Sequence, residues 1–66
     1  MAAKRLTKTQ VMTLRLVNLG LSNQEIAEQQ STTVGTTKWR LHTIFAKLEV
    51  RNRTAAAAKA RRLRLI

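Results

Sequence analysis

The sequence predicts an all-α fold of four short helices, and three observations support this prediction. Two segments carry a capping box, in which a Ser or Thr is followed three residues later by Glu or Gln. Apolar residues recur at steps of three and four, and no strand-like alternation is long enough to compete. The chain contains no proline that would interrupt a helix. We expect the helices at about 8–19, 23–30, 34–48 and 55–63.

The length and the charge of the chain limit its function. A chain of 66 residues allows one small domain, which we place at 6–66 after a short basic lead at 1–5. Thirteen Lys and Arg stand against three acidic residues, for a net charge of +10. This excess favours a polyanionic partner, with nucleic acid first and an anionic membrane surface second. No apolar run spans a bilayer and the N-terminus lacks a signal-peptide core, so we expect a cytoplasmic protein.

The first predicted helix has a clear start and a clear end. It begins at the capping box from Thr7 to Gln10, and Leu14 and Val17 continue along the same side as Gln10. Gly20 then ends the helix as a left-handed C-cap, because glycine adopts positive φ without a steric cost.

The second and third predicted helices are joined by a short polar turn, as in a helix-turn-helix. The second capping box spans Ser22 to Glu25, and Ala27 is small where two helices would cross closely. Thr33 is a good N-cap for the third helix, because its hydroxyl accepts from an orphan backbone N–H. An inward stripe follows at steps of three and four, formed by Val34, Thr37, Leu41, Ile44, Phe45 and Leu48.

The opposite face of the third helix differs from an ordinary solvated face. It carries a cation, an indole, an imidazole and two small residues, namely Gly35, Lys38, Trp39, His42 and Ala46. A core position is the usual one for a Trp, but the helical angle of Trp39 points away from Leu41 and Leu48. Base edges and methyl groups in a DNA major groove suit such a mixed surface. We therefore interpret 34–48 as the recognition helix of a double-stranded DNA-binding domain.

The last predicted helix is rich in alanine and arginine. Thr54 is its expected N-cap, and the four consecutive alanines that follow have high helix propensity. Ala56, Ala60 and Leu63 form a thin packing stripe. The arginines near its end, Arg61, Arg62 and Arg64, fit nonspecific charge better than base reading.

The motifs resemble those of the LuxR-type (GerE-like) helix-turn-helix domain of bacterial transcriptional regulators. The resemblance runs from about Leu6 to the C-terminus and rests on GLSNQEIA at 20–27, GTTK at 35–38 and KLEVRNRT at 47–54. It implies a four-helix domain of the winged-helix-like superfamily, without a wing, whose third helix enters the major groove. It also implies homodimer contacts through the last helix, 55–63, and, for an activator, contact with RNA polymerase. Such a domain is usually one part of a larger regulator.

Several residues depart from the pattern of that family. Polar residues stand at usually apolar positions, so we expect a more polar and less stable core: Thr13, Thr32, Thr37 and Gln30. Gln10 replaces the usual Glu of the first helix, and Arg40 stands where the family mostly has His. Glu49 takes the common Gly position after the recognition helix, so the C-cap there is less favourable.

These observations define the candidate DNA-binding residues. Base contacts are expected from Val34, Gly35, Lys38, Trp39 and His42. Phosphate contacts are expected from Asn23, Gln24, Thr36, Arg40, Thr43, Lys47, Arg51 and Arg53. Alternatives stay open, because Asn23 and Gln24 also fit simple capping, and Arg53 also fits a pair with Glu25.

Other functions fit the sequence less well. A promoter-recognition segment like that of sigma factors has a similar helix-turn-helix, but KLEVRNRT after the recognition helix favours the LuxR type. A nonspecific basic DNA-binding module and an amphipathic membrane peptide are further alternatives, the latter opposed by the two capping boxes. We expect no enzyme, because the sequence has no paired carboxylates, activated nucleophile or Gly-rich phosphate loop. The single His and absent Cys indicate no metal site, and we expect no cofactor.

Overall fold

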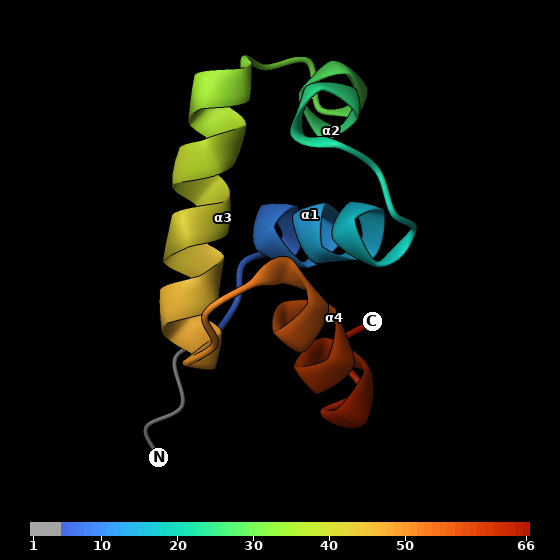
Figure 1. Cartoon of the computed structure of the whole chain (residues 1–66), viewed down its shortest axis with the longest axis vertical. Helices are drawn as coiled ribbons and strands as arrows, with labels where there is room; N and C mark the ends of the chain where they lie inside the picture. Colours follow the sequence, from blue (N-terminus) through green and yellow to red (C-terminus); the bar gives the residue numbers. More distant parts are fainter. Residues whose placement is uncertain (1–4) are drawn as a thin grey trace.

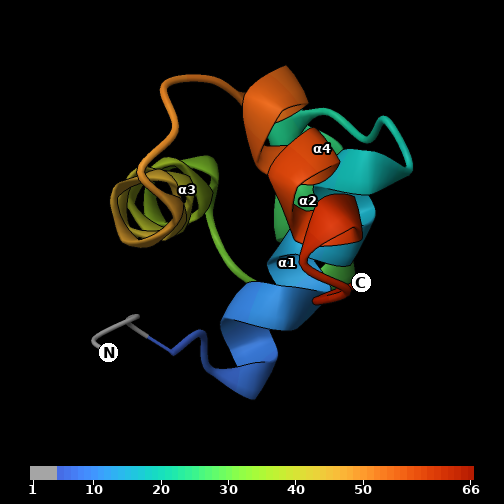
Figure 2. The ribbon, with the colours of Figure 1, turned by 90° about the horizontal axis from the view of Figure 1, so that it is seen from below.

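Residues 5–66 are described by a computed structural model, and they form four α-helices without a strand. The helices are α1 (Lys8–Asn18), α2 (Asn23–Gln29), α3 (Val34–Leu48) and α4 (Arg53–Arg62). In Figure 1, α3 runs along the long side of the molecule, with α2 near its N-terminal end. Viewed along α3, the other three helices all lie on one side of it (Figure 2). The all-α prediction is thereby confirmed.

The N-termini of the helices are capped by side chains, as local sequence chemistry requires. Both predicted capping boxes are present: Thr7 and Gln10 bond reciprocally at 2.9 and 3.1 Å, and Ser22 and Glu25 at 2.8 and 3.1 Å. Thr33 accepts from the Thr36 N–H at 3.1 Å and caps α3.

The cap of α4 differs from the sequence prediction. Thr54 lies inside the helix, and the N-cap is Asn52, whose Oδ1 accepts from the Ala55 N–H at 2.8 Å. The helix therefore begins at Arg53 and not at residue 55. Asn is among the strongest N-cap residues, and its preference over the following Thr explains the earlier start.

Each helix also ends in the same type of C-terminal turn, in which a backbone N–H donates to the carbonyl oxygen of the residue five positions earlier. These bonds run from Leu21 to Leu16 (3.2 Å), Thr32 to Ala27 (2.9 Å), Val50 to Phe45 (3.0 Å) and Leu65 to Ala60 (2.8 Å). In each turn, the residue just before the donor has a positive φ and adopts the left-handed backbone conformation. Glycine occupies that position only after α1, at Gly20, with Ser31, Glu49 and Arg64 at the other ends. Glu49 thus occupies the position, with a φ of 58°, at which the sequence predicts a less favourable C-cap than glycine would give.

The core consists of two adjoining apolar clusters. The first contains Leu14, Ile44, Leu48, Ala56 and Ala60, and the second contains Val17, Ile26, Leu41 and Ala57. Phe45 is half-buried and packs against both clusters. The alanines let the backbone of α4 approach the rest of the core closely. None of the helices within residues 5–66 is both long and apolar enough to cross a bilayer.

Two threonines, Thr13 and Thr37, are fully buried in this core. The core is thus as polar at these two positions as the sequence predicts. The Thr13 hydroxyl lies 2.9 Å from the Thr9 carbonyl oxygen and 3.1 Å from Gln30 Oε1, so its one proton has two acceptors within reach. Thr37 is 0% exposed, and its hydroxyl has no hydrogen-bond partner within residues 5–66. A buried hydroxyl without a partner costs free energy, so Thr37 lowers the stability of the fold.

Candidate nucleic-acid interface

The junction between α2 and α3 fixes how the two helices lie relative to each other. Residues 30–33 connect them, and the Thr32 N–H donates to the Ala27 carbonyl at 2.9 Å. Ala27 and Ile26 are buried, so the small side chain lies at the packed side of α2. A short connection with a fixed turn holds α3 at a defined angle to α2 and leaves the far side of α3 uncovered (Figure 2).

The uncovered side of α3 carries the side chains that the sequence places there. Gly35, Lys38, Trp39, His42 and Ala46 are all exposed. Trp39 is 68% exposed, so the alternative core position is wrong for this indole. Its ring lies 6.1 Å from the His42 ring, centroid to centroid, with the planes tilted by 30°. The two rings therefore present one continuous aromatic surface next to a lysine.

The inward stripe of α3 is shorter than the sequence predicts. Thr37, Leu41, Ile44 and Leu48 are buried, but Val34 is 36% exposed and Phe45 is half-buried. Val34 is the first residue of α3, and the apolar clusters of the core do not include it. Its methyl groups are thus available to a partner, which suits its other expected role as a base contact.

The flank between the two faces is half-buried along its length. It consists of Thr36, Arg40, Thr43 and Lys47, as the helical period predicts. The Thr43 hydroxyl donates to the Trp39 carbonyl at 3.1 Å, and the Thr33 hydroxyl donates to Thr36 Oγ1 at 3.0 Å. Local bonds thus hold both threonines in place.

The two cations of this flank are tied to neighbouring helices. Arg40 Nη1 donates to Gln30 Oε1 at 3.3 Å. Lys47 Nζ donates to Gln10 Oε1 at 2.9 Å and to the Arg5 carbonyl at 3.2 Å. This role of the glutamines was not predicted from the sequence. The signal was present, however, because both residues depart from the family's usual type.

Arg53 connects the start of α4 to the start of α2. Its Nη1 donates to Asn23 Oδ1 at 2.7 Å and its Nη2 donates to the Leu21 carbonyl at 2.9 Å. The alternative pair with Glu25 is wrong, because that carboxylate accepts from the Ser22 N–H in its capping box. Arg53 therefore braces the fold, and so does Asn23.

The remaining candidate phosphate contacts lie at the surface. Gln24 is exposed on the first turn of α2, and Arg51 is exposed between α3 and α4. Lys59, which the sequence analysis did not single out, donates to the Leu48 carbonyl at 2.6 Å. A cation at that position complements the negative end of the α3 dipole.

The end of α4 forms a separate basic region. In both views of the ribbon, the C-terminal end of the chain lies away from α3 (Figures 1 and 2). Arg61, Arg62 and Arg64 are exposed there, and Arg61 Nη1 donates to Asn18 Oδ1. The uncovered face of α3 and the arginines at the end of α4 therefore point to different sides of the domain.

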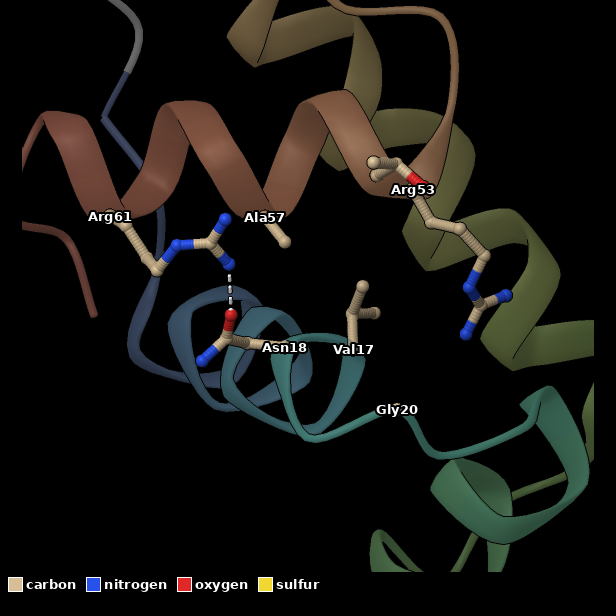
Figure 3. A pocket seen from close by; sticks show the side chains of 7 residues that line it. Val17, Asn18, Gly20, Arg53, Ala57 and Arg61 are labelled. Carbon is tan, nitrogen blue, oxygen red and sulfur yellow. Dashed lines mark hydrogen bonds between the residues drawn. The ribbon is translucent and has the colours of Figure 1, made fainter.

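A hollow of about 300 Å³ lies between the end of α1 and one side of α4. In Figure 3, the Arg61 guanidinium points to Asn18, and the Arg53 side chain runs away from the hollow toward α2. The lining residues are Val17, Asn18, Gly20, Arg53, Thr54, Ala57 and Arg61. No carboxylate, thiol or imidazole is among them. Within residues 5–66, no group of three His, Cys, Asp or Glu is placed to hold a metal ion.

Capped helices, a short α2–α3 junction and an uncovered, chemically mixed face on α3 together define a helix-turn-helix domain. The sequence model of the GerE family, described as bacterial regulatory proteins of the luxR family, matches residues 4–60. The chain therefore belongs to the LuxR family of bacterial regulatory proteins, as its motifs predict.

Curated relatives support the same assignment. The chain is 44% identical over 61 residues to the HTH-type transcriptional regulator AlkS of Ectopseudomonas oleovorans, covering 92% of this chain and 7% of AlkS. It is 39% identical over 61 residues to the transcriptional regulatory protein LiaR of Bacillus subtilis, covering 92% of this chain and 29% of LiaR. The chain thus spans less than a third of the length of these relatives.

A solved structure has the same fold. The crystal structure of the response regulator ChrA of a heme-sensing two-component system aligns with a TM-score of 0.93 and 36% sequence identity. The alignment covers 100% of this chain and 33% of the ChrA chain. The predicted function, a sequence-specific DNA-binding domain of the LuxR type found in transcriptional regulators, is confirmed at this level.

Proposed function

We propose that α3 lies in the major groove of double-stranded DNA and reads base edges with its uncovered face. The residues assigned to this role are Val34, Gly35, Lys38, Trp39 and His42. One observation carries the proposal: a Trp with 68% of its surface exposed lies beside an exposed His and Lys on the side of α3 opposite the core. An exposed indole is unusual in a monomeric domain, and a major groove offers thymine methyl groups and acceptors that match this set.

Lys38 and the aromatic pair have different parts in this proposal. The ammonium of Lys38 donates to guanine acceptors or to a phosphate, whereas the Trp39 and His42 rings contact methyl groups and base edges. Gly35 is exposed and has no side chain to keep the backbone away from DNA. The start of α3 thus admits a close approach.

Phosphates are held by the flank of α3 and by the two neighbouring segments. The proposed contacts come from Gln24, Thr36, Arg40, Thr43, Lys47 and Arg51. Asn23 and Arg53 contribute mainly by holding each other, because their side chains already form a 2.7 Å hydrogen bond. Phosphate contacts supply affinity and register without sequence information.

The domain acts in the bacterial cytoplasm, associated with the nucleoid when it is bound, and the proposal includes no catalytic step. A two-fold pair of domains reads a longer site than one copy does. Homodimerisation would use the exposed side of α4, where Thr54 and Ala58 are small. For an activator, RNA polymerase is the further partner.

Selection of duplexes from a randomised pool tests the proposal. The protein is titrated by fluorescence anisotropy at low and moderate salt, and the enriched duplexes are sequenced. We expect a short motif that Trp39→Ala blurs and that Leu19→Ala, a change of an exposed apolar residue at the end of α1, leaves intact. Tight binding without a motif would show that charge alone binds DNA, and absence of binding at every salt concentration would refute the proposal.

A further inference from the structure

Four cations of this domain share an unusual type of partner. Each donates to the oxygen of a side-chain amide, where an ion pair would have a carboxylate. The pairs are Arg40 with Gln30, Lys47 with Gln10, Arg53 with Asn23, and Arg61 with Asn18. Each pair joins two different helices or a helix to the turn that follows one. The positive charge of these four side chains is therefore not offset by the negative charge of a paired carboxylate.

An amide and a carboxylate hold a cation with opposite consequences for DNA binding. Both accept a hydrogen bond, and a carboxylate accepts a stronger one. A carboxylate also cancels the charge that attracts phosphate, whereas an amide oxygen fixes the position of the cation and leaves that charge in place. Protein–DNA affinity depends on how many cations release counterions from phosphates, so this difference changes affinity directly.

Two of the four pairs lie at the proposed DNA-binding surface. Arg40 and Lys47 are seven residues apart on the same flank of α3, which is roughly 10 Å along the helix axis. Arg40 donates a hydrogen bond to Gln30 at the end of α2, and Lys47 donates one to Gln10 near the start of α1. Both cations are half-buried, so each side chain runs along the protein surface before its charged end emerges.

We propose that Gln10 and Gln30 are positioning residues that set Arg40 and Lys47 for phosphate binding while leaving both cations fully charged. This inference rests on the proposed function. Holding a long side chain in place before binding reduces the rotamer entropy lost on DNA binding. The glutamines thus favour DNA affinity at the expense of the stability that an ion pair would add.

Gln10 shows this exchange most clearly, because its Oε1 serves both a capping box and a cation. It accepts from the Thr7 N–H at 2.9 Å, which completes the capping box, and from Lys47 Nζ at 2.9 Å. A glutamate would satisfy both donors more strongly and would add an acid to the first turn of α1, which has none. The domain would become more stable and would bind DNA less well.

Isosteric charge changes test the proposal. The variants are Gln10→Glu, Gln30→Glu and the double variant, with Gln29→Glu as the matched control. Gln29 is an exposed residue of α2 beside Gln30, so it introduces the same charge without contacting Arg40. Melting temperature and the slope of log affinity against log salt are measured for each protein on one duplex.

We expect Gln10→Glu and Gln30→Glu each to make the salt slope shallower by about 0.9 and to lower affinity about eightfold at 0.1 M salt. Their melting temperatures should stay at or above that of the wild type. Gln29→Glu should leave the slope near its wild-type value. A second pair of variants, Gln10→Leu and Gln30→Leu, keeps all charges and removes the anchors, and it should weaken binding with the salt slope unchanged.

Two results would overturn the inference while leaving the proposed function intact. One is a wild-type salt slope in both glutamate variants, and the other is wild-type affinity in both leucine variants that remain folded. Failure of the wild-type domain to bind any duplex would instead refute the proposed function itself. The two failures are thus distinguishable in one set of titrations.

Discussion

Helices α3 and α4 both bury one side and both carry basic residues, yet their exposed surfaces differ in kind. The core side of α3 contributes branched side chains such as Leu41 and Ile44, whereas α4 contributes only alanines. The exposed side of α3 presents an ammonium, an indole and an imidazole. The exposed end of α4 presents guanidinium groups around Leu63.

This comparison separates two requirements of DNA recognition. Positive charge attracts every duplex equally, and both helices supply it. Discrimination between sequences needs groups that match particular base edges, and only α3 presents such a set.

Truncation of the α3 core should have the largest effect. Ile44 is 0% exposed and lies in the cluster that joins α1, α3 and α4. Ile44→Ala should lower the free energy of unfolding by about 3 kcal/mol, because a cavity remains where the side chain packed. Urea unfolding followed by circular dichroism measures this loss. His42→Ala, an exposed change on the same helix, should leave the urea midpoint near the wild-type value.

Changes on the exposed face of α3 should affect discrimination and not stability. Lys38→Ala and Trp39→Ala should each reduce the preference for the selected site over other duplexes by about 1–3 kcal/mol. Arg62→Ala should weaken all duplexes equally and only slightly, because Arg62 is the last residue of α4 and the C-terminal end of α4 lies away from α3 (Figure 1). Competition titrations with matched and mismatched duplexes measure both effects. Site-dependent losses in Arg62→Ala would contradict the separation of roles.

Removal of the unpartnered hydroxyl in α3 should stabilise the domain. Thr37 is 0% exposed, and its Oγ1 lacks a hydrogen-bond partner within residues 5–66. Thr37→Val replaces the hydroxyl with a methyl group of similar size and should raise the free energy of unfolding by about 1 kcal/mol. The urea midpoint is the measurement. Thr13→Val is the contrast, because that hydroxyl has acceptors at 2.9 and 3.1 Å, and its removal should bring no such gain.

The smallest effect is expected at the end of α3. Glu49 has a φ of 58°, which costs a residue with a Cβ roughly 1–2 kcal/mol relative to glycine. Glu49→Gly removes this strain but adds freedom to the unfolded chain, so the net gain should be about 0.5 kcal/mol. Gly20→Ala is the reciprocal change: its φ is 87°, and outside residues 19–21 nothing within residues 5–66 lies within 4 Å of the added Cβ. It should lower the melting temperature through backbone strain alone, and an unchanged melting temperature would contradict this account.

Local chemistry accounts for the parts of this structure that the sequence predicts well. The capping boxes at Thr7 and Ser22 and the helical period of α3 depend on residues that lie within four positions of one another. The local sequence is therefore enough to predict these conformations. The exposed position of Trp39 follows from the same period. The cap of α4 was predicted less well, because Asn52 and Thr54 are both good N-caps and only one is used.

The all-α fold, the helix-turn-helix and the two faces of α3 could be predicted from the sequence, because they depend on neighbouring residues. Which cations are held, and by which partners, depends on how the helices pack. Gln10 and Lys47 are 37 residues apart, and Asn23 and Arg53 are 30 apart. A pattern along the chain does not show such a contact, since it exists only once α1, α2, α3 and α4 pack around a common core. The physical reason is that long polar side chains reach several alternative partners, and packing selects one of them.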